Sequence, residues 1–164
     1  MFYEEVFKKL SDEKVDYLVI GGVALVLHGV VRLTIDLDIM LLPESDNLKK
    51  FVSAVEKLGY KSKLPLNAND INFKTLRGWR RTRNLEALSF WNPSKPQRSI
   101  DVLIEPAVDY SKASKKKKIV RAGAISIPIA CTEDLIKLKK AAGRPQDLAD
   151  IESLRILEGL GNDD

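Results

Sequence analysis

The sequence predicts one domain of the α/β (α+β) class, with a mixed β-sheet, helices mainly on one face and carboxylates exposed on the other. The chain has 164 residues, 45% hydrophobic and 30% charged, as is typical of a soluble globular domain. Short apolar runs rich in strand-forming residues alternate with segments in which apolar residues recur with the period of a helix. Neither an internal repeat nor a long linker interrupts this pattern, so we expect a single domain over residues 1–164.

The first half of the chain predicts helices and strands in alternation. Phe2, Val6 and Leu10 are four residues apart, which indicates an amphipathic helix. A short apolar run ends at a glycine pair, which indicates a strand, a tight turn and then a buried helix. Gly59 stops a further amphipathic segment that Ser45 or Asp46 could cap. The expected elements are a helix over 2–10, a strand over 17–20, a helix over 23–30, a strand over 35–42 and a helix over 47–58.

The second half predicts a long hairpin, a later strand pair and two closing helices. A polar turn at 92–94 separates two strand-like segments. Thr132 can cap one closing helix, Gly143 stops it, and Pro145 can open the next. The segment before the hairpin is rich in loop residues. The expected elements are strands over 71–74, 85–91, 99–105 and 119–129, a helix over 132–142 and a helix from 145 onward.

The composition excludes several kinds of chemistry. The single Cys131 cannot form an intrachain disulfide, and the single His28 excludes a zinc site built from His and Cys clusters. On a buried helix, His28 is more often a hydrogen-bonded core residue than a catalyst. Chemistry then depends on carboxylates, lysines, arginines and the backbone, which favours hard cations and phosphates.

The longest apolar run argues against a membrane span. It covers 17–31, is interrupted by His28 and glycines, and is shorter than the roughly 20 residues that a membrane helix needs. Acidic residues precede it, where a secretory signal would carry positive charge. We therefore expect a cytoplasmic protein without a membrane partner. The net charge of +4 does not by itself indicate nucleic-acid binding.

Two acids in one strand form the most informative motif. Asp36 and Asp38 are two residues apart in the strand expected over 35–42, so both side chains should project from the face opposite Ile35, Leu37 and Ile39. Two carboxylates this close repel each other unless a cation lies between them, and Mg²⁺ suits such oxygen ligands. The alternative is a pair of surface acids on a half-exposed strand.

A third acid and a glycine pair extend this motif. Asp101 lies in a strand whose alternate residues are apolar, so it could join Asp36 and Asp38 around one or two Mg²⁺ ions if the two strands are neighbours. Gly21 and Gly22 allow a ligand close to the backbone, and a helix that begins there directs N–H groups at an anion. An ordinary tight turn is the alternative for the glycine pair.

At this point the sequence resembles a known superfamily. A glycine pair, a helix, an Asp-x-Asp strand and a lone Asp in a later strand resemble the signature of the DNA polymerase beta-like nucleotidyltransferases. Within that superfamily, the stretch from Gly22 to Leu25 with Arg32, Thr34, Asp36 and Asp38 is similar to the AbiEii-like toxins of abortive-infection systems. The later motif Lys139-x4-Arg144, with Asp147-Leu148-x-Asp150, approximately matches theirs.

The resemblance implies a role for each of these residues. Asp36, Asp38 and Asp101 would bind Mg²⁺, and Asp101 would also activate the attacking hydroxyl. Gly21 and Gly22 would hold phosphate. The reaction would move a nucleoside monophosphate (NMP) from a nucleoside triphosphate (NTP) such as ATP to a hydroxyl of an RNA or protein acceptor. A cognate antitoxin would be the partner if the chain acts as a toxin.

Three basic candidates and a basic cluster have alternative interpretations. Arg32 either pairs with Asp36 or Asp38 or contacts phosphate. Lys139 and Arg144 either bind the triphosphate or lie on a solvated helical face next to acids. The arginines near Trp79 either grip RNA by phosphate contacts and stacking or lie on a mobile charged loop, which is slightly favoured. They are Arg77, Arg80, Arg81 and Arg83.

Two further function classes compete with an Mg²⁺-dependent nucleotidyltransferase. One is a non-catalytic nucleotide-binding or antitoxin-like partner protein of the same fold, which would still bind nucleotide after all three acids are neutralised. The other is an RNA-binding module that uses the arginine cluster, and its binding should weaken as salt rises. The three acids and the glycine pair together favour the enzyme.

Overall fold

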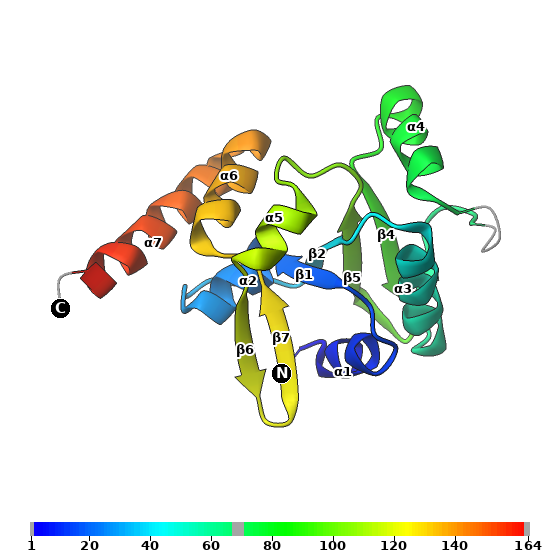
Figure 1. Cartoon of the computed structure of the whole chain (residues 1–164), viewed down its shortest axis with the longest axis horizontal. Helices are drawn as coiled ribbons and strands as arrows, with labels where there is room; N and C mark the ends of the chain where they lie inside the picture. Colours follow the sequence, from blue (N-terminus) through cyan, green and yellow to red (C-terminus); the bar gives the residue numbers. More distant parts are fainter. Residues whose placement is uncertain (1, 67–70, 163–164) are drawn as a thin grey trace.

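The computed structural model describes residues 2–66 and 71–162, and within them the strands form one seven-stranded sheet (Figure 1). The strand order across the sheet is β3-β4-β5-β2-β1-β7-β6. The strands are β1 (Tyr17–Ile20), β2 (Leu37–Leu41), β3 (Lys61–Ser62), β4 (Ala87–Asn92), β5 (Lys95–Leu103), β6 (Lys118–Ala122) and β7 (Ile125–Ile129). The helices are α1 (Glu4–Asp12), α2 (Gly21–His28), α3 (Ser45–Lys57), α4 (Phe73–Arg83), α5 (Tyr110–Lys115), α6 (Thr132–Ala142) and α7 (Pro145–Asn162).

The sheet is mixed, as the sequence predicts. β1 pairs antiparallel with β2 and parallel with β7, while β2 and β5 run parallel to each other. The remaining pairs are antiparallel hairpins or edge contacts. The mixed sheet with its helices confirms the predicted fold class. Because β2 and β5 are parallel neighbours, residues far apart in the sequence lie at the same level on the two strands.

One face of the sheet is covered by α1 and α3. The ring of Phe51 in α3 meets the ring of Phe90 in β4 edge-on, with centroids 5.5 Å apart. Glu5 in α1 forms an ion pair with Arg98 in β5 at 3.0 Å. Because side chains alternate along a strand, the neighbours of Phe90 and Arg98 face the opposite side of the sheet. That opposite face carries Asp101.

The ends of the sheet carry different helices. Figure 1 shows α6 and α7 at one end of the molecule and α4 at the other. In α4, Asn72 caps the first turn, because its side chain accepts a hydrogen bond from the backbone N–H of Thr75. The predicted strand over 71–74 is therefore wrong. The arginines expected on a mobile loop lie on this helix.

The strand that carries the Asp-x-Asp motif is shorter than predicted. It begins at Leu37, so Asp36 lies just before it and Ile35 is 61% exposed rather than in the core. The hydroxyl of Tyr3 donates to the carbonyl oxygen of Ile35, which holds this backbone outside the strand pairing. The expectation that both acids lie within one strand is therefore wrong for Asp36.

The other predicted elements agree with the structure to within a few residues. The strand over 17–20 and the helix over 132–142 have the predicted bounds, and 119–129 forms the strand pair β6 and β7. The short helix α5 was not predicted, because its six residues leave little periodic pattern. Across the part of the chain that the structure describes, none of the helices has the length and apolar character needed to span a membrane.

Candidate active site

Asp38 and Asp101, here called the acid pair, lie side by side on neighbouring strands. Asp38 in β2 is the register partner of Asp101 in β5. The residues next to them in each strand are fully buried on the other face, so the two carboxylates share the opposite face. Those buried residues are Leu37, Ile39, Ile100 and Val102. The topology thus places together two acids that are 63 positions apart in the sequence.

The carboxylates influence each other electrostatically. Burial and repulsion from Asp101 and Asp36 raise the pKa of Asp38 to about 7, against the opposing effect of Lys139 and Arg144. Burial and repulsion from Asp101 also raise the pKa of Asp36, while Lys63 lowers it. The arrangement therefore holds negative charge that is not fully compensated, which is the condition in which a bound cation stabilises a site.

The chemistry of the acid pair fits a hard divalent cation, but a complete cluster of ligands is not assembled. Within residues 2–66 and 71–162, no three His, Cys, Asp or Glu side chains are grouped so that they could hold a metal ion. Asp36 is exposed and lies one residue before the strand, near enough to Asp38 and Asp101 for their charges to repel. One oxygen of Asp101 accepts a hydrogen bond from the hydroxyl of Ser99 at 3.0 Å. The Mg²⁺ site therefore stays a prediction.

The glycine pair provides space that these side chains occupy. A methyl group at Gly21 would lie 2.2 Å from Oδ2 of Asp38, and Gly21 has a φ of +66°. A methyl group at Gly22 would lie 2.5 Å from the hydroxyl oxygen of Thr34. Both glycines are thus required for the close approach of β2 and its preceding loop to the start of α2.

The start of α2 also has the features of an anion site. Its N-cap residue is Ile20, whose side chain cannot accept a hydrogen bond, and no capping hydrogen bond is seen among the described residues. The N–H groups of the first turn, which begins at Gly21, are therefore available to a ligand, and the helix dipole favours a negative one. This geometry supports the predicted phosphate role of the glycines without testing it.

Basic residues of α6 and the following loop form an ion-pair network with two buried acids of α7. Lys139 lies 2.8 Å from Asp150 and 3.3 Å from Asp147. Arg144 contacts Asp147 at 2.8 Å, and Arg32 contacts Asp150 at 2.8 Å. Asp147 and Asp150 are 1% and 2% exposed, so the acidic members of these pairs are shielded from solvent.

This network corrects the sequence-based interpretations of Arg32 and Lys139. Arg32 pairs with Asp150 rather than with Asp36 or Asp38. The side chain of Lys139 is 9% exposed and does not lie on a solvated helical face. The side chain of Arg144 is 73% exposed, so of the three basic residues it has the most freedom to reach a ligand.

The hydrogen bonds of Arg144 and Asp147 explain how α7 begins. The carboxylate of Asp147 accepts from the backbone N–H of Arg144 at 3.1 Å and from its Nε at 2.8 Å. Burial raises the pKa of Asp147, but these hydrogen bonds and Lys139 outweigh it and hold the pKa below its usual range. Asp147 is therefore ionised at neutral pH and fixes Arg144 next to the start of the helix.

Three residues near the acids were not predicted. Ser99 is two residues before Asp101 in the same strand, and this spacing places both on one face. Tyr3 donates to the carbonyl oxygens of Ile35 and Ser99 and so links the backbone before β2 to β5. Lys63 follows the two-residue strand β3, which has too little pattern to be recognised in the sequence.

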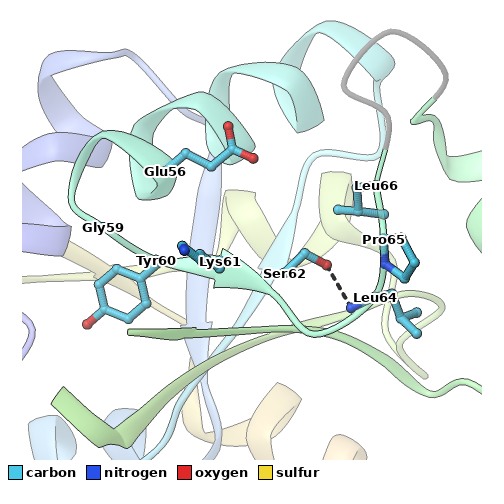
Figure 2. Close-up of a pocket in the computed structure, with 8 residues that line it drawn as sticks. All are labelled: Glu56, Gly59, Tyr60, Lys61, Ser62, Leu64, Pro65 and Leu66. Carbon is cyan, nitrogen blue, oxygen red and sulfur yellow. Dashed lines mark hydrogen bonds between the residues drawn. The ribbon is translucent and has the colours of Figure 1, made fainter. Parts of the chain in front are cut away.

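Other candidate features lie away from the acids. One nitrogen of the His28 ring lies 2.8 Å from the carbonyl oxygen of Ala130, as expected for a structural histidine. A cavity of about 420 Å³ lies between the end of α3 and β3, where the Ser62 hydroxyl accepts from the N–H of Leu64 (Figure 2). Another, of about 350 Å³, lies between α4 and the end of β5. Neither cavity is lined by the acid pair.

A comparison with family models decides the class of protein. Residues 3–162 match the family described as "Nucleotidyltransferase of unknown function (DUF6036)". The chain belongs to this family. It is therefore a nucleotidyltransferase, as the three acids and the glycine pair predict. No curated protein matches the sequence.

Solved structures share the fold of this nucleotidyltransferase. The lincosamide antibiotic adenylyltransferase LnuA, bound to lincomycin, is 15% identical with a TM-score of 0.60 over 94% of this chain and 96% of its own. A putative nucleotidyltransferase (TM1012) from Thermotoga maritima is 16% identical, with a TM-score of 0.54 over 98% and 90%. ANT(2″)-Ia in complex with adenylyl-2″-tobramycin is 15% identical, with a TM-score of 0.57 over 97% and 87%. At these identities the similarity shows the fold.

Proposed function

We propose that the protein transfers an NMP group from an NTP to a hydroxyl of an acceptor, with the acid pair at the reaction centre. The observation that supports this most strongly is the register of β2 and β5, which sets Asp38 beside Asp101. Gly21 lies directly against Asp38, so the start of α2 adjoins the same carboxylates. A phosphate chain at this helix start would have its α-phosphate near the acid pair.

The proposed reaction forms one bond and breaks one. The acceptor oxygen bonds to the α-phosphorus, and the bond from the α-phosphorus to the oxygen bridging to the β-phosphate breaks. Pyrophosphate leaves with that electron pair. The hydroxyl proton passes to a carboxylate of the acid pair, for which we propose Asp101, and then to solvent. The products are the NMP ester of the acceptor, pyrophosphate and one proton.

Asp38, Asp101 and the nearby Asp36 would hold the divalent cation. When bound, Mg²⁺ supplies charge stabilisation for the phosphate oxygens and for the attacking and leaving oxygens. The acid pair carries the repulsion that such an ion relieves, and this repulsion contributes to the raised pKa of Asp38. Ser99 orients one oxygen of Asp101 by a hydrogen bond and leaves the other available.

The basic residues would bind the triphosphate unequally. Arg144 is mostly exposed and lies near enough to Asp38 to affect its pKa, so it can contact the phosphate chain directly. Lys139 is held by Asp147 and Asp150 and would act mainly through its charge. Arg32 is occupied by Asp150 and would support the loop before β2.

Small hydroxyl compounds are the acceptors that we propose to test first. Two of the fold relatives are antibiotic adenylyltransferases, one bound to lincomycin and one to an adenylylated tobramycin. RNA and protein acceptors, a toxin role of the AbiEii type and its cognate antitoxin are further hypotheses from the sequence motifs. The alternative from another functional class is a protein of the same fold that binds nucleotide without catalysing a transfer.

Transfer of label from NTP tests the proposal. The protein is incubated with Mg²⁺ and each α-³²P-labelled NTP, and with pools of small hydroxyl compounds, tRNA or cell protein. Label should appear on one acceptor pool. Unlabelled pyrophosphate should be released in an amount equal to the NMP transferred. Asp38→Asn and Asp101→Asn should abolish the transfer, while Asp109→Asn, at the N-cap of α5, should retain it.

Two results would reject this function. If no pool is labelled and equilibrium dialysis detects no Mg²⁺-dependent NTP binding, the chain is not an active transferase. If NTP binds equally well after all three acids are changed to Asn, the non-catalytic alternative is correct.

A further inference from the structure

Two rows of side chains cross the open face of the sheet beside the acid pair. Lys63 donates its backbone N–H to the carbonyl oxygen of Ser89 at 2.9 Å, and Ser89 is the register partner of Asp101. Since Asp101 is in turn the partner of Asp38, one row runs across four neighbouring segments. Directly opposed residues in such pairs share a face. The row consists of Lys63, Ser89, Asp101 and Asp38.

The second row lies next to the first. Lys61 in β3 is the partner of Trp91 in β4, and Trp91 is the partner of Ser99 in β5. Trp91 is 37% exposed, which is unusual for a tryptophan in the middle of a sheet and leaves part of its indole ring open to a ligand. The opposite face of these strands is covered by α1 and α3.

Both rows begin with a lysine at β3, and the first row ends with the two acids. Lys61 and Lys63 are exposed and form no ion pair with any residue of the described ranges. Lys63 is bonded through its backbone to Ser89, the register partner of Asp101, so its side chain leaves the sheet on the same face as the acids. A molecule with its hydroxyl at Asp101 would reach Lys63 across two strand spacings, or about 10 Å.

We propose that Lys63, Ser89, Ser99 and Trp91 form the acceptor subsite, and that they bind a small hydroxyl compound with a phosphate group. This inference rests on the proposed function, because it places the acceptor hydroxyl at Asp101. The serines offer hydrogen bonds to hydroxyls, Trp91 offers an apolar surface to the sugar or polyol, and Lys63 pairs with the phosphate. The nucleotide would enter from the opposite side, where Arg144 and the start of α2 lie.

The same charges disfavour polycationic acceptors. An aminoglycoside such as tobramycin carries several ammonium groups and would place them near Lys61 and Lys63. A unit charge about 10 Å from another contributes a few tenths of a kcal/mol in water, so several such pairs weaken binding by about fivefold to tenfold. This subsite therefore predicts an acceptor unlike that of ANT(2″)-Ia, with which the protein shares its fold.

Amide NMR titrations test the subsite without requiring turnover. The protein is saturated with Mg²⁺ and a non-hydrolysable ATP analogue, so that the nucleotide side is filled, and ribose 5-phosphate or ribose is then added. Ribose 5-phosphate should shift the amides of Lys63, Ser89, Ser99 and Asp101 and bind at least about tenfold tighter than ribose. Tobramycin should shift these amides only at concentrations at least about fivefold higher than ribose requires.

Two variants separate the subsite from a general charge effect. Lys63→Met should weaken the binding of ribose 5-phosphate by about tenfold, so that its affinity equals that of ribose. Lys50→Met removes the same charge from α3, on the other face, and should leave the affinity within about twofold. Equal binding of the two sugars, unchanged binding after Lys63→Met, or tobramycin binding along the rows as tight as that of ribose would each overturn the proposal.

The titrations also distinguish this inference from the proposed function. The ATP analogue reports on the nucleotide side through the amides of Gly21 and Gly22, and its failure to bind would contradict the proposed function alone. A second titration without the analogue shows whether ribose 5-phosphate still reaches the rows. A short oligoribonucleotide that shifts the amides of α4 in place of the rows would reassign the acceptor to RNA and reject the small-molecule subsite.

Discussion

The two sides of the acid pair differ in how their positive charges are held. On the α6–α7 side, Lys139 and Arg32 are paired with buried aspartates at 2.8 Å, and Arg144 is paired at its Nε. On the β3–β5 side, Lys63 is exposed and lies on the same face as the acids without an ion-pair partner in the described residues. Rigid charges suit a ligand that is common to every turnover, such as a triphosphate. An unpaired charge on an open face suits a second ligand that must enter and leave.

The largest effect is expected from breaking the buried network at Asp150. Asp150→Ala leaves Arg32 without its partner and Lys139 with only Asp147 among the described residues. The free energy of unfolding should fall by about 3 kcal/mol, because charges buried in ion pairs lose compensation. Urea denaturation followed by circular dichroism measures this.

Glu133 provides the control for Asp150. Its side chain is 65% exposed and pairs with Lys137 in the same helix. Glu133→Ala should change stability by less than about 1 kcal/mol, as is usual for solvent-exposed pairs. Equal effects of the two substitutions would contradict the view that the α6–α7 side is the rigid one.

The next effect concerns the glycine that adjoins Asp38. Gly21→Ala should lower stability by about 2 kcal/mol and reduce transfer to below about 1%, because the new methyl displaces the carboxylate. Gly123→Ala is the matched control, since Gly123 has a φ of +63° and an added methyl group there would meet nothing within 4 Å. Gly123→Ala should lower the free energy of unfolding by about 1 kcal/mol because of backbone strain, and it should retain full transfer activity. Equal transfer by both variants would show that Asp38 has room to move.

A third prediction concerns the pH dependence of the acid pair in the metal-free protein. The folded chain raises the pKa of Asp38 to about 7, whereas the unfolded chain releases this proton near pH 4. Stability should therefore fall as pH rises from about 4 to 7 and stay low above 7. After allowance for solvent screening, Asp38→Asn should recover about 2 kcal/mol at pH 8 and nothing at pH 3.

Asp109 tests the sign of that pH dependence. The Ser111 hydroxyl and the Lys112 backbone N–H lower the pKa of Asp109, so its charge is stabilising. Asp109→Asn should therefore lower the melting temperature at pH 8 and leave it unchanged at pH 2. Thermal unfolding in the presence of a chelator measures both variants, and a shift in the same direction for both would refute the assignment for Asp38.

The smallest effect on stability is expected for Arg144. Because its side chain is 73% exposed, Arg144→Gln should cost less than about 1 kcal/mol in unfolding. The KM for NTP should nevertheless rise by about tenfold, since a direct phosphate contact is lost, while kcat changes little. A change confined to kcat would place Arg144 outside the triphosphate site.

The acids were recognised in the sequence because alternation in strands is a strong local pattern. The pattern around Ile100 and Val102 indicated the face of Asp101, and the parallel pairing of β2 with β5 was then enough to bring it to Asp38. The pattern failed at Ile35 and Asp36, because a backbone held by Tyr3 is not in the sheet. That hydrogen bond joins residues 32 positions apart, which no local spacing reveals.

The basic side chains were harder to interpret for a related reason. Asp147 and Asp150 are three residues apart and share a face of α7, which the sequence indicates, but their partners come from α6 and from the loop at Arg32. Whether a lysine is solvated or buried depends on how these elements pack. No sequence pattern indicated a role for Lys63, since its position follows from an edge strand of only two residues.

Because Gly21 and Asp38 are in contact, substitutions at these two positions, 17 residues apart in the sequence, depend on each other. A relative of this protein that keeps the aspartate must keep glycine at position 21, because any larger residue would occupy the space of a carboxylate oxygen. A relative that has lost the aspartate is free to accept Asn there, which tolerates the left-handed backbone. A residue other than glycine at position 21 is therefore expected only in relatives that have lost this aspartate.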